Sequence, residues 1–103
     1  MKIKDMKRRR RKVLNQLVRL SGWITGSLVK TERTQNGKKS PFNYLSRSRN
    51  GSNRITYVAS ADLDIFSESV QNGKIAKRLF EQITELTIAI IKAEQQQQKG
   101  KRR

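Results

Sequence analysis

A tight turn constrains the middle of this chain more than any other feature. Two runs rich in β-branched, aromatic and alternating polar residues, 42–49 and 52–58, flank Asn50-Gly51. Asn-Gly between such runs is the strongest short-range pattern for a β-hairpin, because a type I′ turn needs a positive φ at both central positions. With Asn50-Gly51 as the loop, the register places Arg47 opposite Arg54 and Tyr44 opposite Tyr57.

Side chains alternate along a strand, so this register sorts the hairpin into two faces. We expect one face to be a buried core, and it carries Phe42, Tyr44, Ile55 and Tyr57. We expect the other to face outward, and it carries Asn43, Leu45, Arg47, Arg49, Arg54, Thr56 and Val58. Like charges directly opposite in a ladder are destabilising, so the Arg47–Arg54 pair indicates an anion between them. The alternative is that both arginines point into water, where their repulsion is screened.

The residues before the hairpin predict a helix and a further strand. Apolar residues spaced four apart indicate a helix over about 7–20, which Ser21-Gly22 ends. Residues 23–33 are rich in β-branched and apolar types, and Asn36-Gly37 offers a second tight turn. We therefore expect residues 23–59 to form a three-stranded antiparallel meander.

Two helices are predicted after the sheet. Ser60 is a suitable N-cap for the first helix, which we expect Asn72-Gly73 to end. The second helix is predicted over 74–97, with an apolar stripe that covers the sheet or, alternatively, forms a homodimer seam. The fold class is thus α+β: an N-terminal helix, a three-stranded antiparallel sheet and two C-terminal helices.

Charge is strongly positive and unevenly spread. Lys and Arg number 24 against 8 Asp and Glu, which gives a net charge of +16 in 103 residues. Such an excess indicates a polyanionic partner. The run of basic residues near the start predicts a basic arm over 1–12, followed by a single domain over 13–95 and a polar, basic tail over 96–103.

Several kinds of chemistry have little support in the sequence. Cysteine and histidine are both absent, so thiolate ligands and the usual general base are missing. Asp62, Asp64 and Glu68 on one short helix would form a poor metal cage. For these reasons we expect no enzyme activity, no metal and no cofactor. We also expect no membrane association, because no apolar run approaches the length needed to span a bilayer. The expected location is cytoplasmic and nucleoid-associated.

Three short motifs carry a resemblance to a known family. They are Gly-Ser-Leu at 26–28, Tyr-Leu-Ser-Arg at 44–47 after Pro41-Phe42-Asn43, and Tyr57-Val58 before the helical part. Over residues 22–95 the chain resembles small uncharacterised basic proteins of bacteria and archaea, some of which accompany mobile genetic elements. Many members carry cysteines in the loop after the first strand, where this chain has none. The resemblance implies the strand and helix layout and brings no activity with it.

The function predicted from these observations is non-enzymatic nucleic-acid binding. Duplex DNA is favoured over RNA because Phe42, Tyr44 and Tyr57 are expected to be buried, and the context would be an accessory or regulatory factor of a mobile element. The alternatives are a small RNA-binding subunit of a ribonucleoprotein and a protein adaptor or homodimer using the helix over 74–95. The candidate nucleic-acid contacts are Arg8, Arg9, Arg10, Arg11, Lys12, Lys30, Lys38, Lys39, Arg47, Arg49 and Arg54.

Overall fold

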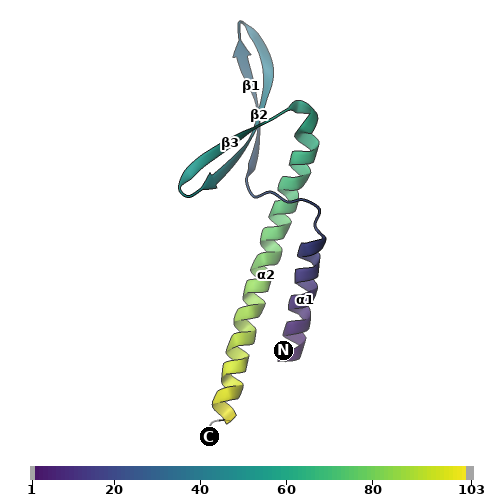
Figure 1. The fold of residues 1–103 in the computed structure, drawn as a ribbon, viewed down its shortest axis with the longest axis vertical. Coiled ribbons are helices and arrows are strands. Elements are labelled where there is room, and N and C mark those ends of the chain that lie inside the picture. The colour runs from purple at the N-terminus through teal and green to yellow at the C-terminus, as the bar shows by residue number, and fades with distance from the viewer. Residues whose placement is uncertain (1, 102–103) are drawn as a thin grey trace. The chain divides into compact units, whose positions relative to one another are not determined.

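Two tight turns fold the middle of the chain into an antiparallel sheet of order β1-β2-β3 (Figure 1). The strands are β1 (Ser27–Gln35), β2 (Lys38–Arg49) and β3 (Ser52–Val58). Asn and Gly at both turns have positive φ, 55° and 74° at residues 36 and 37, and 52° and 78° at residues 50 and 51. Arg47 pairs with Arg54 and Tyr44 with Tyr57. The predicted meander and the register of its second hairpin are confirmed, although the first strand begins at Ser27 rather than at residue 23.

The computed structural model describes residues 2–101, which divide into two compact units. One comprises Ser21–Lys74; the other joins the chain up to Leu20 with the chain from Ile75 onward. The two helices are α1 (Ile3–Arg19) and α2 (Leu63–Lys101), and a 3₁₀ turn over Ser60–Asp62 precedes α2. The predicted boundaries at residues 12 and 95 fall inside α1 and α2.

The core of the unit over Ser21–Lys74 lies between one face of the sheet and the first turns of α2. Leu45, Val58 and Val70 are buried there, and the partly buried residues packed against them are Ile24, Leu28, Leu63 and Phe66. β2 pairs with β1 through residues 38–46 and with β3 through residues 43–49, so all three strands overlap only near its middle. The core is therefore small and sits where the two hairpins share β2.

The predicted assignment of the two sheet faces is wrong. Leu45 and Val58 were expected to face outward but are buried, whereas Ile55 and Tyr57 were expected in the core and are each 62% exposed. The physical reason is that the first turns of α2 pack on the face of Leu45 and Val58, which also contains the buried Asn43. Leu45 and Val58 need no hydrogen-bond partner there, whereas a buried tyrosine needs a partner for its hydroxyl.

A single continuous helix follows the sheet, so the prediction of two C-terminal helices is also wrong. Asn72-Gly73 lies inside α2 and holds the segment that precedes β1. The Asn72 amide donates to the carbonyls of Ser21 and Gly22, at 2.7 and 3.3 Å. A Cβ at residue 73 would collide with the carbonyl of Ile24, whose N–H donates to the Ser69 carbonyl at 3.0 Å. Glycine serves close backbone packing here rather than helix termination.

The start of α2 also differs from the expectation. Ser60 was predicted as an N-cap, but Ala59 occupies that position before the 3₁₀ turn, and no side chain caps it. Asp62 and Asp64 lie in the first turns, where a carboxylate interacts favourably with the positive end of the helix dipole. Charge, rather than a capping hydroxyl, therefore supports this helix start.

In the second unit, α1 packs antiparallel to the later part of α2. The Arg10 guanidinium donates to the Thr87 hydroxyl at 3.2 Å, and the Lys7 ammonium lies 3.9 Å from the Glu94 carboxylate. The buried apolar side chains of this unit are Met6, Val13, Ala76, Leu79 and Ile90. α1 begins at Ile3 rather than near residue 7, because Met6 extends the stripe of Val13 by two turns. Most of the predicted basic arm is thus helical.

We expect Gly73→Ala to lower the free energy of unfolding by about 1–3 kcal/mol, the usual cost of forcing extra volume into a packed site. Gly100→Ala is the matched control, because no atom lies within 4 Å of the position of its Cβ. Alanine in an open helical site should be neutral or stabilising by up to about 1 kcal/mol. Chemical denaturation followed by circular dichroism measures both. Equal effects at the two positions would contradict the packing role of Gly73.

Candidate nucleic-acid interface

The outward face of the sheet carries a cluster of aromatic side chains, which we call the aromatic platform: Phe42, Tyr44, Ile55 and Tyr57. The Phe42 ring centroid lies 5.8 Å from that of Tyr44 and 5.8 Å from that of Tyr57, with interplanar angles of 45° and 34°. Phe42 and Tyr44 are half-buried, while Ile55 and Tyr57 are exposed. Cross-strand pairing fixes the spacing of the platform, since Tyr44 lies directly opposite Tyr57.

A positively charged side chain, that of Arg33, lies against this platform. The Arg33 guanidinium carbon lies 4.4 Å from the centroid of the Phe42 ring, which is the geometry of a cation–π contact. Arg33 reaches the ring from β1, where its neighbour Thr31 pairs with Phe42. By the alternation of side chains along β2, Lys38 lies on the same face as Phe42. The platform is therefore apolar at its centre and cationic toward the β1–β2 turn.

Exposed aromatic rings beside fixed cations suit single-stranded nucleic acid. Bases stack on aromatic side chains while Lys and Arg contact the phosphates, and every base has a π face, so such binding tolerates many sequences. A sheet surface presents several rings at once, and RNA-binding sheets stack two or three bases in this way. Bases in a duplex are already stacked on their neighbours, so their faces are not free to stack on the rings of the platform.

Three predicted arginines lie together on the opposite face of the β2–β3 hairpin. Arg47 and Arg54 are cross-strand partners, and Arg49 pairs with Ser52 beside the turn. The Arg47 Nε donates to the Thr25 carbonyl at 3.0 Å. A Cβ at Gly26, whose φ is 153°, would lie 2.8 Å from the Arg47 Cγ. Arg47 therefore packs on the protein backbone, whereas no such contact holds Arg54 among the described residues.

The remaining predicted contacts are spread over other elements. Lys38 and Lys39 are exposed at the β1–β2 turn, and Lys30 is exposed on β1. Residues 8–12 all lie on α1, in the other unit. Arg10 is half-buried and bonded to Thr87, while its four neighbours in this run are exposed. Within the Ser21–Lys74 unit the structure brings together Arg47, Arg49 and Arg54, and it separates them from the platform by the thickness of the sheet.

Two kinds of residue at this candidate interface were not among the predicted contacts. Arg33 was not among the candidates, although the Asn36-Gly37 turn places it opposite Ser40, next to Phe42 along β2. The aromatic residues were assigned to the core instead of the surface. The two tyrosines on that face could have predicted its exposure, because their hydroxyl groups favour a position in contact with solvent.

Two negative findings concern residues 2–101. Within them, no three Asp or Glu side chains come close enough to hold a metal ion. Neither α1 nor α2 has, over its described length, the apolar stretch that a bilayer span requires.

Comparison of the chain with protein-family models, with curated proteins and with solved structures finds no match. The resemblance described above stays a prediction.

The paired arginines give a test of the hairpin. Arg54→Thr removes their repulsion and keeps β propensity, so we expect a gain of a few tenths to about 1 kcal/mol in the free energy of unfolding. Arg47→Thr removes the same repulsion but also deletes the bond to the Thr25 carbonyl, which is worth about 1 kcal/mol. Thermal and chemical denaturation should rank Arg54→Thr as the more stable variant. The reverse order would mean that the Arg47 contact contributes nothing in solution.

Proposed function

We propose that this protein is a non-enzymatic binder of single-stranded nucleic acid, with the aromatic platform as its base-contacting surface. The observation that carries the proposal is that Tyr57 and Ile55 are exposed on the face of the sheet where the Arg33 guanidinium lies over the Phe42 ring. The preference for duplex DNA rested on these rings being buried, and that premise is wrong. The geometry favours RNA or unpaired DNA, and with it the ribonucleoprotein subunit over the duplex-binding accessory factor.

Electrostatics supports the same class of partner. A net charge of +16 on 103 residues attracts any polyanion, and phosphate contacts by Lys and Arg release counterions. This electrostatic attraction alone gives no preference between single strands and duplexes. Ring stacking supplies the preference, at about 1–3 kcal/mol for each stacked base. The two contributions predict tight binding at low salt and a preference for unpaired bases that persists at higher salt.

The test measures fluorescence anisotropy with labelled single-stranded RNA, single-stranded DNA and duplex DNA of equal length. We expect the wild-type protein to bind both single strands more tightly than the duplex at 150–200 mM salt, a range in which phosphate contacts are already weakened. We expect Tyr57→Ser to weaken single-strand binding about tenfold or more, as the loss of one stacking partner implies. Its melting temperature should change little, because the side chain is largely exposed.

Two control variants separate stacking from folding and from general loss of apolar surface. Ile65→Ser removes a side chain of α2 that is 66% exposed and lies outside the platform, so binding should persist. Leu45→Ala should cost about 2–5 kcal/mol of stability, as expected for a buried leucine. Equal binding of duplex and single strands, with no effect of Tyr57→Ser, would overturn the proposal. If the Tyr57→Ser variant fails to fold, the aromatic face is part of the core and not a binding surface.

A second candidate function rests on the other unit. Both helices of this unit expose apolar side chains on their surface, and few apolar side chains of the unit are buried. On α2 the exposed set includes Phe80, Ile88 and Ile91, whose spacing puts them on one face of the helix. On α1 it includes Leu14 and Val18, one turn apart. Contiguous exposed apolar residues mark association surfaces. Two pairs of antiparallel helices, one from each chain, can pack together as a four-helix bundle. We propose homodimerisation through this surface.

Light scattering after size exclusion tests the dimer. We expect twice the chain mass at micromolar concentration, and the mass of one chain for Phe80→Gln, which places an amide where the bundle would bury a ring. Ile65→Gln is the matched control, since it changes an equally exposed side chain of the same helix outside this surface. A single-chain mass for the wild-type protein across the concentration range would contradict the dimer and leave the stacking proposal unaffected.

A further inference from the structure

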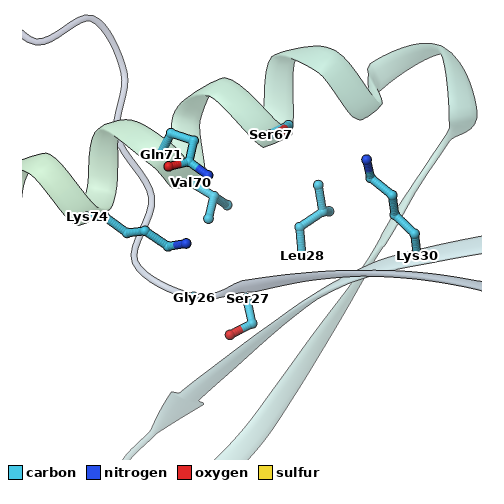
Figure 2. A pocket seen from close by; sticks show the side chains of 8 residues that line it. All are labelled: Gly26, Ser27, Leu28, Lys30, Ser67, Val70, Gln71 and Lys74. Carbon is cyan, nitrogen blue, oxygen red and sulfur yellow. The ribbon is translucent and has the colours of Figure 1, made fainter.

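The face of the sheet opposite the platform contains a second polar feature, a pocket between β1 and the first turns of α2 (Figure 2). Its volume is about 300 Å³, at the lower end of the range for small-ligand sites. It lies wholly within the Ser21–Lys74 unit. The lining residues are Gly26, Ser27, Leu28, Lys30, Ser67, Val70, Gln71 and Lys74.

Two lysines from different elements line this pocket, one on either side of Leu28. Figure 2 shows Lys30 extending from β1 toward α2, and Lys74 extending from α2 toward β1. Lys30 was a predicted contact, whereas Lys74 was not and was expected to begin a second helix. Continuity of α2 through Gly73 is what brings Lys74 to the wall of the pocket.

No acidic side chain lines the pocket. Among the described residues neither Lys30 nor Lys74 forms a salt bridge. Two ammonium groups that face the same small space repel each other unless an anion lies between them. The other polar groups can also donate: Gln71 has an amide NH₂, and Ser67 has a hydroxyl. All the polar side chains that come from α2 can therefore interact with an oxyanion.

The lining is partly apolar, whereas its cationic groups are exposed to water. Val70 is buried and Leu28 is half-buried, and both belong to or pack against the core of the unit. Lys30, Lys74 and Gln71 are exposed, so solvent partly screens the attraction between a lysine and an anion. The close contacts of Gly26 with Leu45 and Arg47 hold the adjoining backbone in place. The anion site is thus supported by the same packing that forms the core.

We propose that this pocket binds a phosphate group, held by the ammonium groups of Lys30 and Lys74 with Gln71 and Ser67 as further donors. Lysine is a common phosphate ligand because its compact charge offers several rotatable donors. The phosphate belongs to a backbone diester, to a terminal monoester of a nucleic acid, or to a free phosphorylated molecule. The inference does not rest on the aromatic platform, because the two sites lie on opposite faces of the sheet.

The probe is inorganic phosphate, followed by two-dimensional amide NMR of the full-length, ¹⁵N-labelled protein at constant ionic strength. Chloride replaces phosphate in the reference titration. We expect saturable shifts at the amides of Gly26, Leu28 and Gln71 with phosphate and not with chloride. Lys30→Gln and Lys74→Gln should each weaken the apparent affinity about tenfold, the loss expected for one charge-assisted contact.

Matched variants keep the result interpretable. Lys77→Gln removes the same charge from α2 three residues further along, outside the pocket lining, and should leave the affinity unchanged. Lys74→Arg keeps the charge and should retain binding. Absence of saturable shifts, or the same loss with Lys77→Gln as with Lys74→Gln, would overturn the proposal. Tyr57→Ser should bind inorganic phosphate normally, so failure of the platform and failure of the pocket are distinguished.

Two oligonucleotides identify the source of the phosphate. They share one sequence and differ only in a 5′-phosphate. If Lys74→Gln abolishes a preference for the phosphorylated form, the ligand is a terminal monoester; if it weakens both equally, the ligand is a backbone diester. If it affects only inorganic phosphate, the ligand is a free phosphorylated molecule. Each of these three results supports a phosphate site.

Discussion

Burial of Leu45 and Val58 beneath the first turns of α2 is the interaction on which the rest of the Ser21–Lys74 unit depends. This unit has one helical segment to pack on its sheet, so one face of the sheet is covered and the other is left uncovered within the unit. Aliphatic side chains at three strand positions, Leu28, Leu45 and Val58, pack against the helix without leaving a polar group unsatisfied. The rings of Phe42, Tyr44 and Tyr57 consequently lie on the uncovered face, where Tyr57 is exposed and the other two rings are half-buried.

The segment before β1 crosses α2 at Asn72 and Gly73, and this crossing positions the sheet against the helix. The segment before β1 runs close against α2, with its carbonyls bonded to Asn72 and its backbone touching the helix at Gly73. A glycine inside a helix costs about 1 kcal/mol relative to alanine. Here the close backbone approach that it permits offsets that cost. The same crossing fixes the start of β1 and, through it, the wall of the lysine pocket.

The sheet separates two kinds of surface on its opposite faces. One is aromatic and bears Arg33, which suits stacked bases; the other adjoins a polar pocket with Lys30 and Lys74, which suits a phosphate group. Both are built on regular elements whose positions are set by strand pairing and by the core, rather than on loops. Rigid support of this kind holds binding groups in place before a ligand arrives and lowers the entropy cost of binding.

The sequence by itself determined the turns, the strand register, the helix α1 and the excess of positive charge, because each follows from local residue types. Asn-Gly pairs require positive φ, and alternation then fixes which residues share a face. It did not determine which face is buried, because the pattern has period two and places large apolar side chains on both faces, Phe42 and Ile55 on one and Leu45 and Val58 on the other. That choice depended on where α2 packs. The same holds for Asn72-Gly73, which locally resembles a helix end. Only the tertiary contact with Ile24 shows that the glycine is there so that two backbones can meet.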